Sequence, residues 1–173
     1  MAKHKFIGLF VLCCFLPLFA AWLVLASGWY QGGVNSKGQW LTTEIKLLPA
    51  VPATAPHWRL VFIAPASCQQ ACARTLQLMT QIHTALGRKQ QQLTLLVAAA
   101  QFPTGLADGL PKGVQFQQSD VTGFQVGSLV LVEQQGLALL QYPLPLQSQQ
   151  LPLAGKAVMA DLKKLMNYDR GPV

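Results

Sequence analysis

Cys68 and Cys72 are the residues of this sequence whose types and spacing are best suited to chemistry. They follow an apolar run and a Pro-Ala-Ser turn, at the point where the pattern changes from strand to helix. The beginning of a helix carries partial positive charge and unpaired N–H groups, which favour a thiolate over a thiol. The sequence therefore predicts a pair of activated thiols at a strand-to-helix junction.

The CxxxC spacing leaves three roles open for this pair. It places Cys72 about one helical turn after Cys68, so the two sulfur atoms can converge. In the first role, Cys68 attacks a disulfide and Cys72 resolves the mixed disulfide. In the second, both thiolates bind Cu(I), which prefers sulfur ligands. In the third, the pair is a static disulfide. The three-residue insert suits a metal slightly more than a tight redox loop.

A copper site of this kind usually needs a third ligand, and histidine is scarce. His57 precedes the first strand and is expected roughly 20 Å from the cysteines, at ~3.3 Å per strand residue. His83 lies about 16 Å along the helix from Cys72, at ~1.5 Å per helical residue. Met79 is two turns from Cys72, where a methionine is more often part of the core. We therefore expect a two-sulfur site whose third ligand is not identified.

The N-terminal segment predicts a membrane anchor. No charged residue occurs from residue 6 to residue 26, a length that spans roughly 30 Å as a helix. This apolar run is longer than that of a cleavable signal peptide. Lys3 and Lys5 predict a cytoplasmic N-terminus, residues 1–5, by the positive-inside rule. The rest of the chain is then expected on the periplasmic side of the inner membrane, and Cys13 and Cys14 within the membrane.

Charge and motifs exclude several other functions. The net charge is +7, but the basic residues are scattered and are not interleaved with aromatic residues, unlike a nucleic-acid-binding surface. The sequence has no nucleophile elbow, no HExxH zinc motif and no phosphate-binding glycine loop. The acidic residues are too dispersed to form a catalytic carboxylate pair.

The remaining pattern predicts an α/β domain over residues 58–173, preceded by a Gly- and Pro-rich linker over residues 27–57. Trp40, Leu41, Ile45 and Leu47 could still form a short strand at the edge of this domain. Residues 101–113 are broken by glycine and proline and have room for one helical turn at most. The expected elements are a strand over 58–64, a helix over 70–86, a strand over 93–100, a short edge strand over 114–117, a hairpin over 129–132 and 137–142, and a helix over 154–166. This is the thioredoxin-like order, a central mixed sheet with flanking helices.

Several of these pieces together resemble the SCO-like, cytochrome-oxidase-associated membrane proteins of proteobacteria. They are the single anchor, Gly28-Trp29, Asn35 to Gly38, the strand Trp58 to Phe62, Cys68-x-x-x-Cys72, Leu129 to Gly136 and Asp161 to Leu165. The resemblance implies a thioredoxin-like copper chaperone or thiol-disulfide reductase. It also implies copper ligands at Cys68, Cys72 and a distal histidine, with cytochrome c oxidase subunits or other assembly factors as partners.

The sequence departs from this family pattern at two positions. The distal histidine should precede the strand at Leu129, and residues 120–128 contain none. Glu133-Gln134 replaces the usual Asp-Pro after that strand. The leading hypothesis is a membrane-anchored, periplasm-facing accessory protein for oxidase assembly that acts through Cys68 and Cys72, by Cu(I) binding or by thiol redox chemistry.

Two alternatives remain. The first is an enzyme, a thiol-disulfide oxidoreductase. It ranks second because the sequence has no proline just before the strand at Leu129, where thioredoxins keep one that faces the redox pair. The second is a non-catalytic assembly or interaction protein that retains a degenerate thioredoxin fold.

Overall fold

The computed structural model describes residues 2–27, 36–106, 109–145 and 148–168. The chain divides into two compact units, Met1–Asn35 and Ser36–Val173. Each unit is described by itself.

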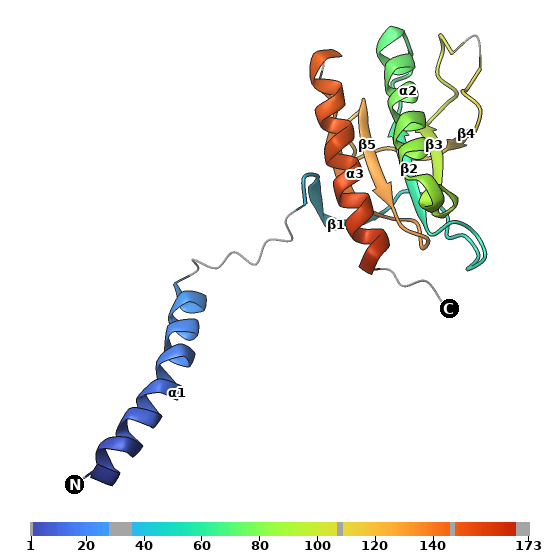
Figure 1. The fold of residues 1–173 in the computed structure, drawn as a ribbon. Coiled ribbons are helices and arrows are strands. Elements are labelled where there is room, and N and C mark those ends of the chain that lie inside the picture. The colour runs from blue at the N-terminus through green and yellow to red at the C-terminus, as the bar shows by residue number, and fades with distance from the viewer. Residues whose placement is uncertain (1, 28–35, 107–108, 146–147, 169–173) are drawn as a thin grey trace. The chain divides into compact units, whose positions relative to one another are not determined.

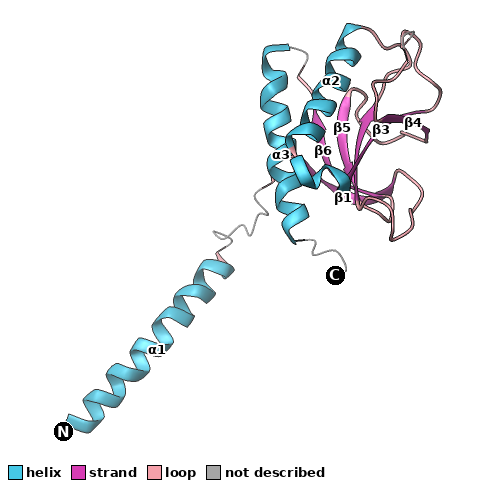
Figure 2. Cartoon of the chain, turned by 45° about the vertical axis from the view of Figure 1, so that its right-hand side comes forward, coloured by secondary structure: helices cyan, strands magenta, loops and turns pink. Residues whose placement is uncertain are grey.

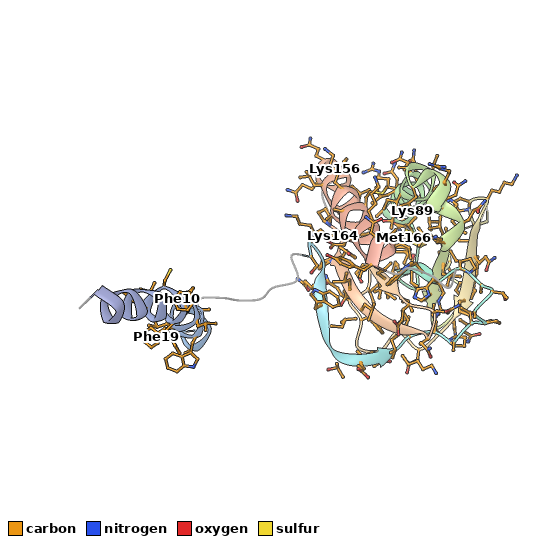
Figure 3. All side chains as sticks on the ribbon, turned by 60° about the horizontal axis from the view of Figure 1, so that its bottom comes forward. Phe10, Phe19, Lys89, Lys156, Lys164 and Met166 are labelled. Atoms are coloured by element: carbon orange, nitrogen blue, oxygen red, sulfur yellow. A yellow bond between two sulfur atoms is a disulfide. The ribbon has the colours of Figure 1, made fainter. Side chains whose placement is uncertain are left out.

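The N-terminal unit contains one helix, α1, which spans Ala2–Ala26 and has Pro17 in its interior. Its large apolar side chains are exposed, with Phe10 and Phe19 projecting from the helix (Figure 3). Among the described residues, no helix combines the length and the apolarity required to cross a membrane. The transmembrane segment at residues 6–26 stays a prediction.

The second unit is built on a six-stranded mixed sheet (Figure 1). Its strand order is β1-β6-β5-β2-β3-β4. The pairs β2·β3 and β3·β4 are parallel, and the pairs β2·β5, β5·β6 and β1·β6 are antiparallel. The strands are β1 (Gln39–Lys46), β2 (Trp58–Ile63), β3 (Leu93–Ala99), β4 (Val114–Gln118), β5 (Ser128–Val132) and β6 (Leu137–Pro143).

Strand β2 lies inside the sheet and is buried over its whole length. Successive side chains of a strand point to opposite faces. Leu60 and Phe62 accordingly enter the larger core on one face, and Val61 and Ile63 enter a second cluster on the other. A run that is apolar except for Arg59 satisfies both faces at once, which is why this segment forms an inner strand.

Both long helices of this unit cover the same face of the sheet (Figure 2). Helix α2 spans Gln70–Ala85 and is followed by the 3-10 helix η1 (Gly87–Gln92). Helix α3 spans Leu151–Tyr168 and follows the short 3-10 helix η2 (Ser148–Gln150). Met79 of α2 and Leu162 of α3 are fully buried against the strands. The strand, helix, strand, hairpin and closing helix predicted from the sequence are confirmed.

The opposite face is covered by segments outside the helices, including Leu47, Leu48 and Phe124. The first two belong to the predicted linker, residues 27–57. From Ser36 onward that segment is part of the compact unit, because β1 pairs with β6 at the edge of the sheet. The short edge strand that the sequence left open is therefore present. Residues 101–106 and 109–113 contain no helix.

Candidate thiol-disulfide site

The two cysteines lie where β2 turns into α2. The main chain leaves β2 through Ala64, whose N–H donates to the carbonyl of Ala98 over 3.0 Å. Pro65 then ends the strand, because proline cannot donate to a sheet ladder. Helix α2 begins at Gln70, and its N-cap residue Gln69 makes no side-chain capping bond. Cys68 thus precedes the helix, and Cys72 lies in its first turn.

Cys68 and Cys72 form a disulfide, with their Cα atoms 5.4 Å apart. The predicted convergence of the two sulfur atoms is therefore present. It arises because α2 begins directly after Gln69, whose carbonyl accepts the N–H of Cys72 over 3.0 Å, so that Cys72 lies one turn after Cys68. A joined pair is compatible with a redox site and with a static disulfide. The two roles differ in whether another thiol can reach the bond.

Both cysteines are buried, with 2% and 3% of their surfaces exposed. The segment over residues 101–106 covers Cys68. The N–H of Cys68 donates to the carbonyl of Thr104 over 2.7 Å, and the N–H of Thr104 donates to the carbonyl of Ala66 over 2.9 Å. Gly105 follows, packed so closely that a Cβ atom there would lie 2.1 Å from the carbonyl oxygen of Cys68. This cover was not predicted, because the glycines and prolines of residues 101–113 indicated only a break in regular structure.

Two hollows adjoin the turn that carries the cysteines, and Pro65 lines both of them. The first has a volume of about 140 Å³ and is lined by Cys72, with Phe62 and Leu144 among its apolar walls. The second has a volume of about 540 Å³ and lies beside Ser67 and the segment from Ala99 to Phe102. Only the first has a cysteine in its wall.

Arg74 is the one charged residue that lines the hollow at Cys72 within the described part of the chain. It is exposed on α2, one residue before Thr75. The Thr75 hydroxyl group donates to the carbonyl of Ala71 over 3.1 Å and is thereby satisfied within the helix. The positive end of the α2 dipole and the Arg74 guanidinium both favour negative charge at this end of the sheet. Sequence reasoning did not single out Arg74, because nothing local distinguishes it from other surface cations.

The described residues do not bring a third metal ligand to the cysteines. They contain no group of three or more His, Cys, Asp or Glu side chains that could hold a metal ion. The ring of His57 packs against Trp58 at the start of β2, with the ring centroids 5.1 Å apart. His83 lies in the last turn of α2, and Met79 is buried in the core. The donor set available for a soft metal is therefore the two sulfur atoms alone, once they are reduced.

A protein-family model described as "Transmembrane-like, thioredoxin-like, C-terminal domain" matches residues 58–169. A comparison with curated proteins found no match. Among solved structures, the chain is similar to apo Sco1 from Thermus thermophilus, at 15% identity and a TM-score of 0.45, over 77% of this chain and 99% of that one. An SCO1/SenC family lipoprotein from Bacillus anthracis has 10% identity and a TM-score of 0.47, over 74% and 98% of the two chains.

A third similar structure is BsSco, described as a member of the Sco family of cytochrome c oxidase assembly proteins. It shares 15% identity with a TM-score of 0.46, over 73% of this chain and 95% of that one. At this level of similarity no functional residue is transferred from these three proteins.

Proposed function

Because the chain belongs to the transmembrane-like, thioredoxin-like C-terminal domain family, we propose that it carries out reversible thiol-disulfide exchange at Cys68 and Cys72. The observation that supports this proposal is the position of the disulfide. It joins the end of β2 to the first turn of α2, beside a hollow in whose wall Cys72 lies. A partner thiol that enters this hollow meets the bond at the positive end of a helix.

The short span of the disulfide supports a role other than holding the domain together. A cross-link that closes only the loop from Cys68 to Cys72 restricts the unfolded chain little. By the chain-entropy relation it stabilises the fold by about 2 kcal/mol. The sheet and both helices bury a large core, of which the two cysteines are a small part. Reduction is therefore expected to leave the domain folded, as a cycling redox pair requires.

The exchange needs no group beyond the thiols of the two proteins. A partner thiolate attacks one sulfur atom, the bond between Cys68 and Cys72 breaks, and the other sulfur leaves as a thiolate. A second partner thiolate then attacks the mixed disulfide and releases the remaining cysteine. Two electrons and two protons pass to the chain, and the partner gains one disulfide. The reverse sequence reduces a partner disulfide.

The setting that we propose is the periplasmic side of the inner membrane, with α1 as the anchor and oxidase subunits or other assembly factors as partners. The uncharged sequence from residue 6 to residue 26 supports the anchor. The resemblance of the WRL strand and the CxxxC motif to SCO-like proteins supports a role in oxidase assembly. Membrane fractionation of the full chain, beside a chain that begins at Ser36, tests the anchor. Recovery of the full chain in the soluble fraction would contradict it.

Copper binding is the second candidate, and the convergence of the two sulfur atoms favours it. Once reduced, both thiolates can bind one Cu(I), which prefers sulfur. Because the described residues supply no third ligand, we expect retention to depend on a ligand from a partner or on a two-sulfur site. Anaerobic titration with Cu(I) uses the reduced chain with Cys13→Ser and Cys14→Ser, because these two thiols would also bind Cu(I). It is expected to reach about one ion per chain and to fail when Cys68 and Cys72 are also replaced by serine. No uptake by the reduced chain would exclude this candidate.

A redox titration tests the leading proposal. The full chain carries Cys13→Ser and Cys14→Ser, because these two cysteines are free and exposed and would add background thiol. The protein is equilibrated in detergent with glutathione buffers and then alkylated. One two-electron transition is expected, with circular dichroism unchanged across it. A disulfide that resists reduction until urea unfolds the domain would contradict the proposal and leave a static cross-link.

A further inference from the structure

We infer that thiol exchange begins at Cys72, and that Arg74 favours a partner thiol carried by an acidic peptide. This inference rests on the proposed function and assigns its order of events. It reverses the order considered for the sequence, in which Cys68 is the reactive cysteine and Cys72 resolves the intermediate.

The covering of Cys68 is the first argument. Its N–H is bonded to Thr104, and Gly105 lies against its carbonyl oxygen. The segment over residues 101–106 thus holds the main chain of Cys68 on both of its polar groups. Neither of the two hollows at the turn is lined by Cys68. Cys68 is 2% exposed, and neither hollow offers an attacking thiolate a route to it.

The opening at Cys72 is the second argument. Cys72 lines a hollow of about 140 Å³, a volume comparable to the ~150 Å³ cavity that accepts benzene in an apolar protein interior. This space is sufficient for the sulfur and methylene group of a cysteine. The apolar walls, which include Phe62 and Leu144, suit the methylene group.

The position of Cys68 at the start of α2 makes its sulfur a suitable leaving group. When a partner thiolate attacks Cys72, the electron pair of the broken bond goes to the sulfur of Cys68. Cys68 directly precedes the N-cap residue Gln69, whose side chain makes no capping bond. The N–H groups of Cys72 and Ala73 donate to the carbonyl of Gln69. The positive end of the helix still favours the thiolate that forms at Cys68.

The charge of Arg74 favours an acidic peptide as the carrier of the incoming thiol. Arg74 lines the hollow, and no acidic residue does so among the described residues. A carboxylate beside the incoming thiol is therefore attracted, and an ammonium group is repelled. The attraction acts between exposed groups, so salt is expected to weaken it. Glutathione, a peptide thiol with two carboxylates and one ammonium group, is a suitable probe.

Mapping the first mixed disulfide tests the order of events. The oxidised full chain, with Cys13→Ser and Cys14→Ser, reacts briefly with glutathione, and iodoacetamide traps the released thiol. Peptide mass spectrometry then identifies which cysteine carries glutathione. We expect glutathione on Cys72 and the alkyl group on Cys68. The opposite labelling would overturn the inference and leave thiol exchange intact. A folded chain that gives neither product would overturn both.

Rates with different thiols test the role of Arg74. We expect Arg74→Gln to slow reduction by glutathione about 3- to 5-fold at low salt, from ~1 kcal/mol for charges about 4 Å apart in water. Reduction by 2-mercaptoethanol, whose reacting thiolate has no carboxylate beside it, is expected to slow less, and the glutathione effect to vanish at 1 M salt, where the Debye length is ~3 Å. Arg88→Gln, an exposed change beyond the other end of α2, is the matched control. Equal slowing of both thiols by Arg74→Gln would overturn the charge assignment.

Discussion

The hydroxyl group of Tyr142 donates a hydrogen bond to Oδ2 of Asp161 over 3.0 Å inside the domain. The same carboxylate oxygen accepts the N–H groups of Lys37, at 2.7 Å, and Gly38, at 2.9 Å. Both Tyr142 and Asp161 are buried. One carboxylate thus joins β6, α3 and the segment that leads into β1. Gly38 fits here because a Cβ atom would lie 2.5 Å from the Tyr142 ring.

The Tyr142 hydroxyl group is expected to stabilise the fold through this carboxylate. Tyr142→Phe removes a hydrogen bond to a charged acceptor, which contributes about 1.5 to 3 kcal/mol. Urea denaturation of the full chain should show a loss of this size in the free energy of unfolding. Tyr168→Phe is the matched control, because that tyrosine is 86% exposed. Equal stability of the two variants would show that the bond contributes nothing net.

The same tyrosine predicts how stability depends on alkaline pH. Burial raises the pKa of Tyr142 far above its usual value of 10, and the Asp161 charge and hydrogen bond raise it further. Above pH ~10 the unfolded chain releases this proton while the folded chain keeps it. The contribution of Tyr142 is therefore complete below pH 10 and is lost as the pH rises further. The free energy of unfolding should fall less steeply between pH 9 and 11 in Tyr142→Phe than in the unchanged protein. Parallel curves would contradict the raised pKa.

The sequence predicted those elements whose signals are local. The run from Trp58 to Ile63 is apolar except for Arg59, which favours a strand buried on both faces. The helix after Gln69 followed from apolar residues at three- and four-residue intervals, ending before Gly87. The strand or helix preference of these segments is set by their own residues. In the structure, both segments begin and end within one or two residues of their predicted bounds.

The parts that were not predicted depend on contacts between distant segments. The sequence left strand β1 open as a possible short edge strand, and it forms because the edge of β6 offers hydrogen-bonding groups to this segment. The cover over Cys68 depends on Gly105, which lies far from it in sequence and whose tight approach has no local signature. The CxxxC spacing predicted that the sulfur atoms converge, but burial and access at the two cysteines are set by that cover.

Arg59 is expected to be needed for stability rather than chemistry. Its Nη1 donates to the carbonyl of Pro49 over 2.8 Å, and its Nη2 donates to the carbonyls of Glu133, over 2.6 Å, and Gln134, over 3.2 Å. Burial lowers the pKa of Arg59, and the Glu133 charge partly offsets this effect. A lysine cannot span acceptors on two segments, so Arg59→Lys should lose about 2 kcal/mol of unfolding free energy.

Urea denaturation measures this loss, and Arg88→Lys, an exposed change in η1, is the control. The two variants carry the same chemical change, so their difference isolates the three carbonyl contacts. The reduction potential of the disulfide, measured in glutathione buffers, should be the same in Arg59→Lys as in the unchanged protein. A shifted potential would instead place Arg59 in the redox chemistry.

Gly105 is expected to control access to the disulfide, and Gly109 provides its control. Both have positive φ, +91° and +78°, so alanine at either position incurs a backbone cost of about 1 to 2 kcal/mol. Only at Gly105 would the new Cβ atom collide with the carbonyl of Cys68, whereas nothing lies within 4 Å of it at Gly109. Gly105→Ala must therefore displace the segment over Cys68 as well.

The two alanine variants should consequently differ in both stability and thiol reactivity. We expect Gly105→Ala to unfold at lower urea than Gly109→Ala, and its disulfide to be reduced faster by dithiothreitol under native conditions. Brief reaction with glutathione should now also label Cys68, because its cover is displaced. If Gly105→Ala and Gly109→Ala are reduced at the same rate, the segment does not shield the bond. Cys68 would then be buried by the core alone.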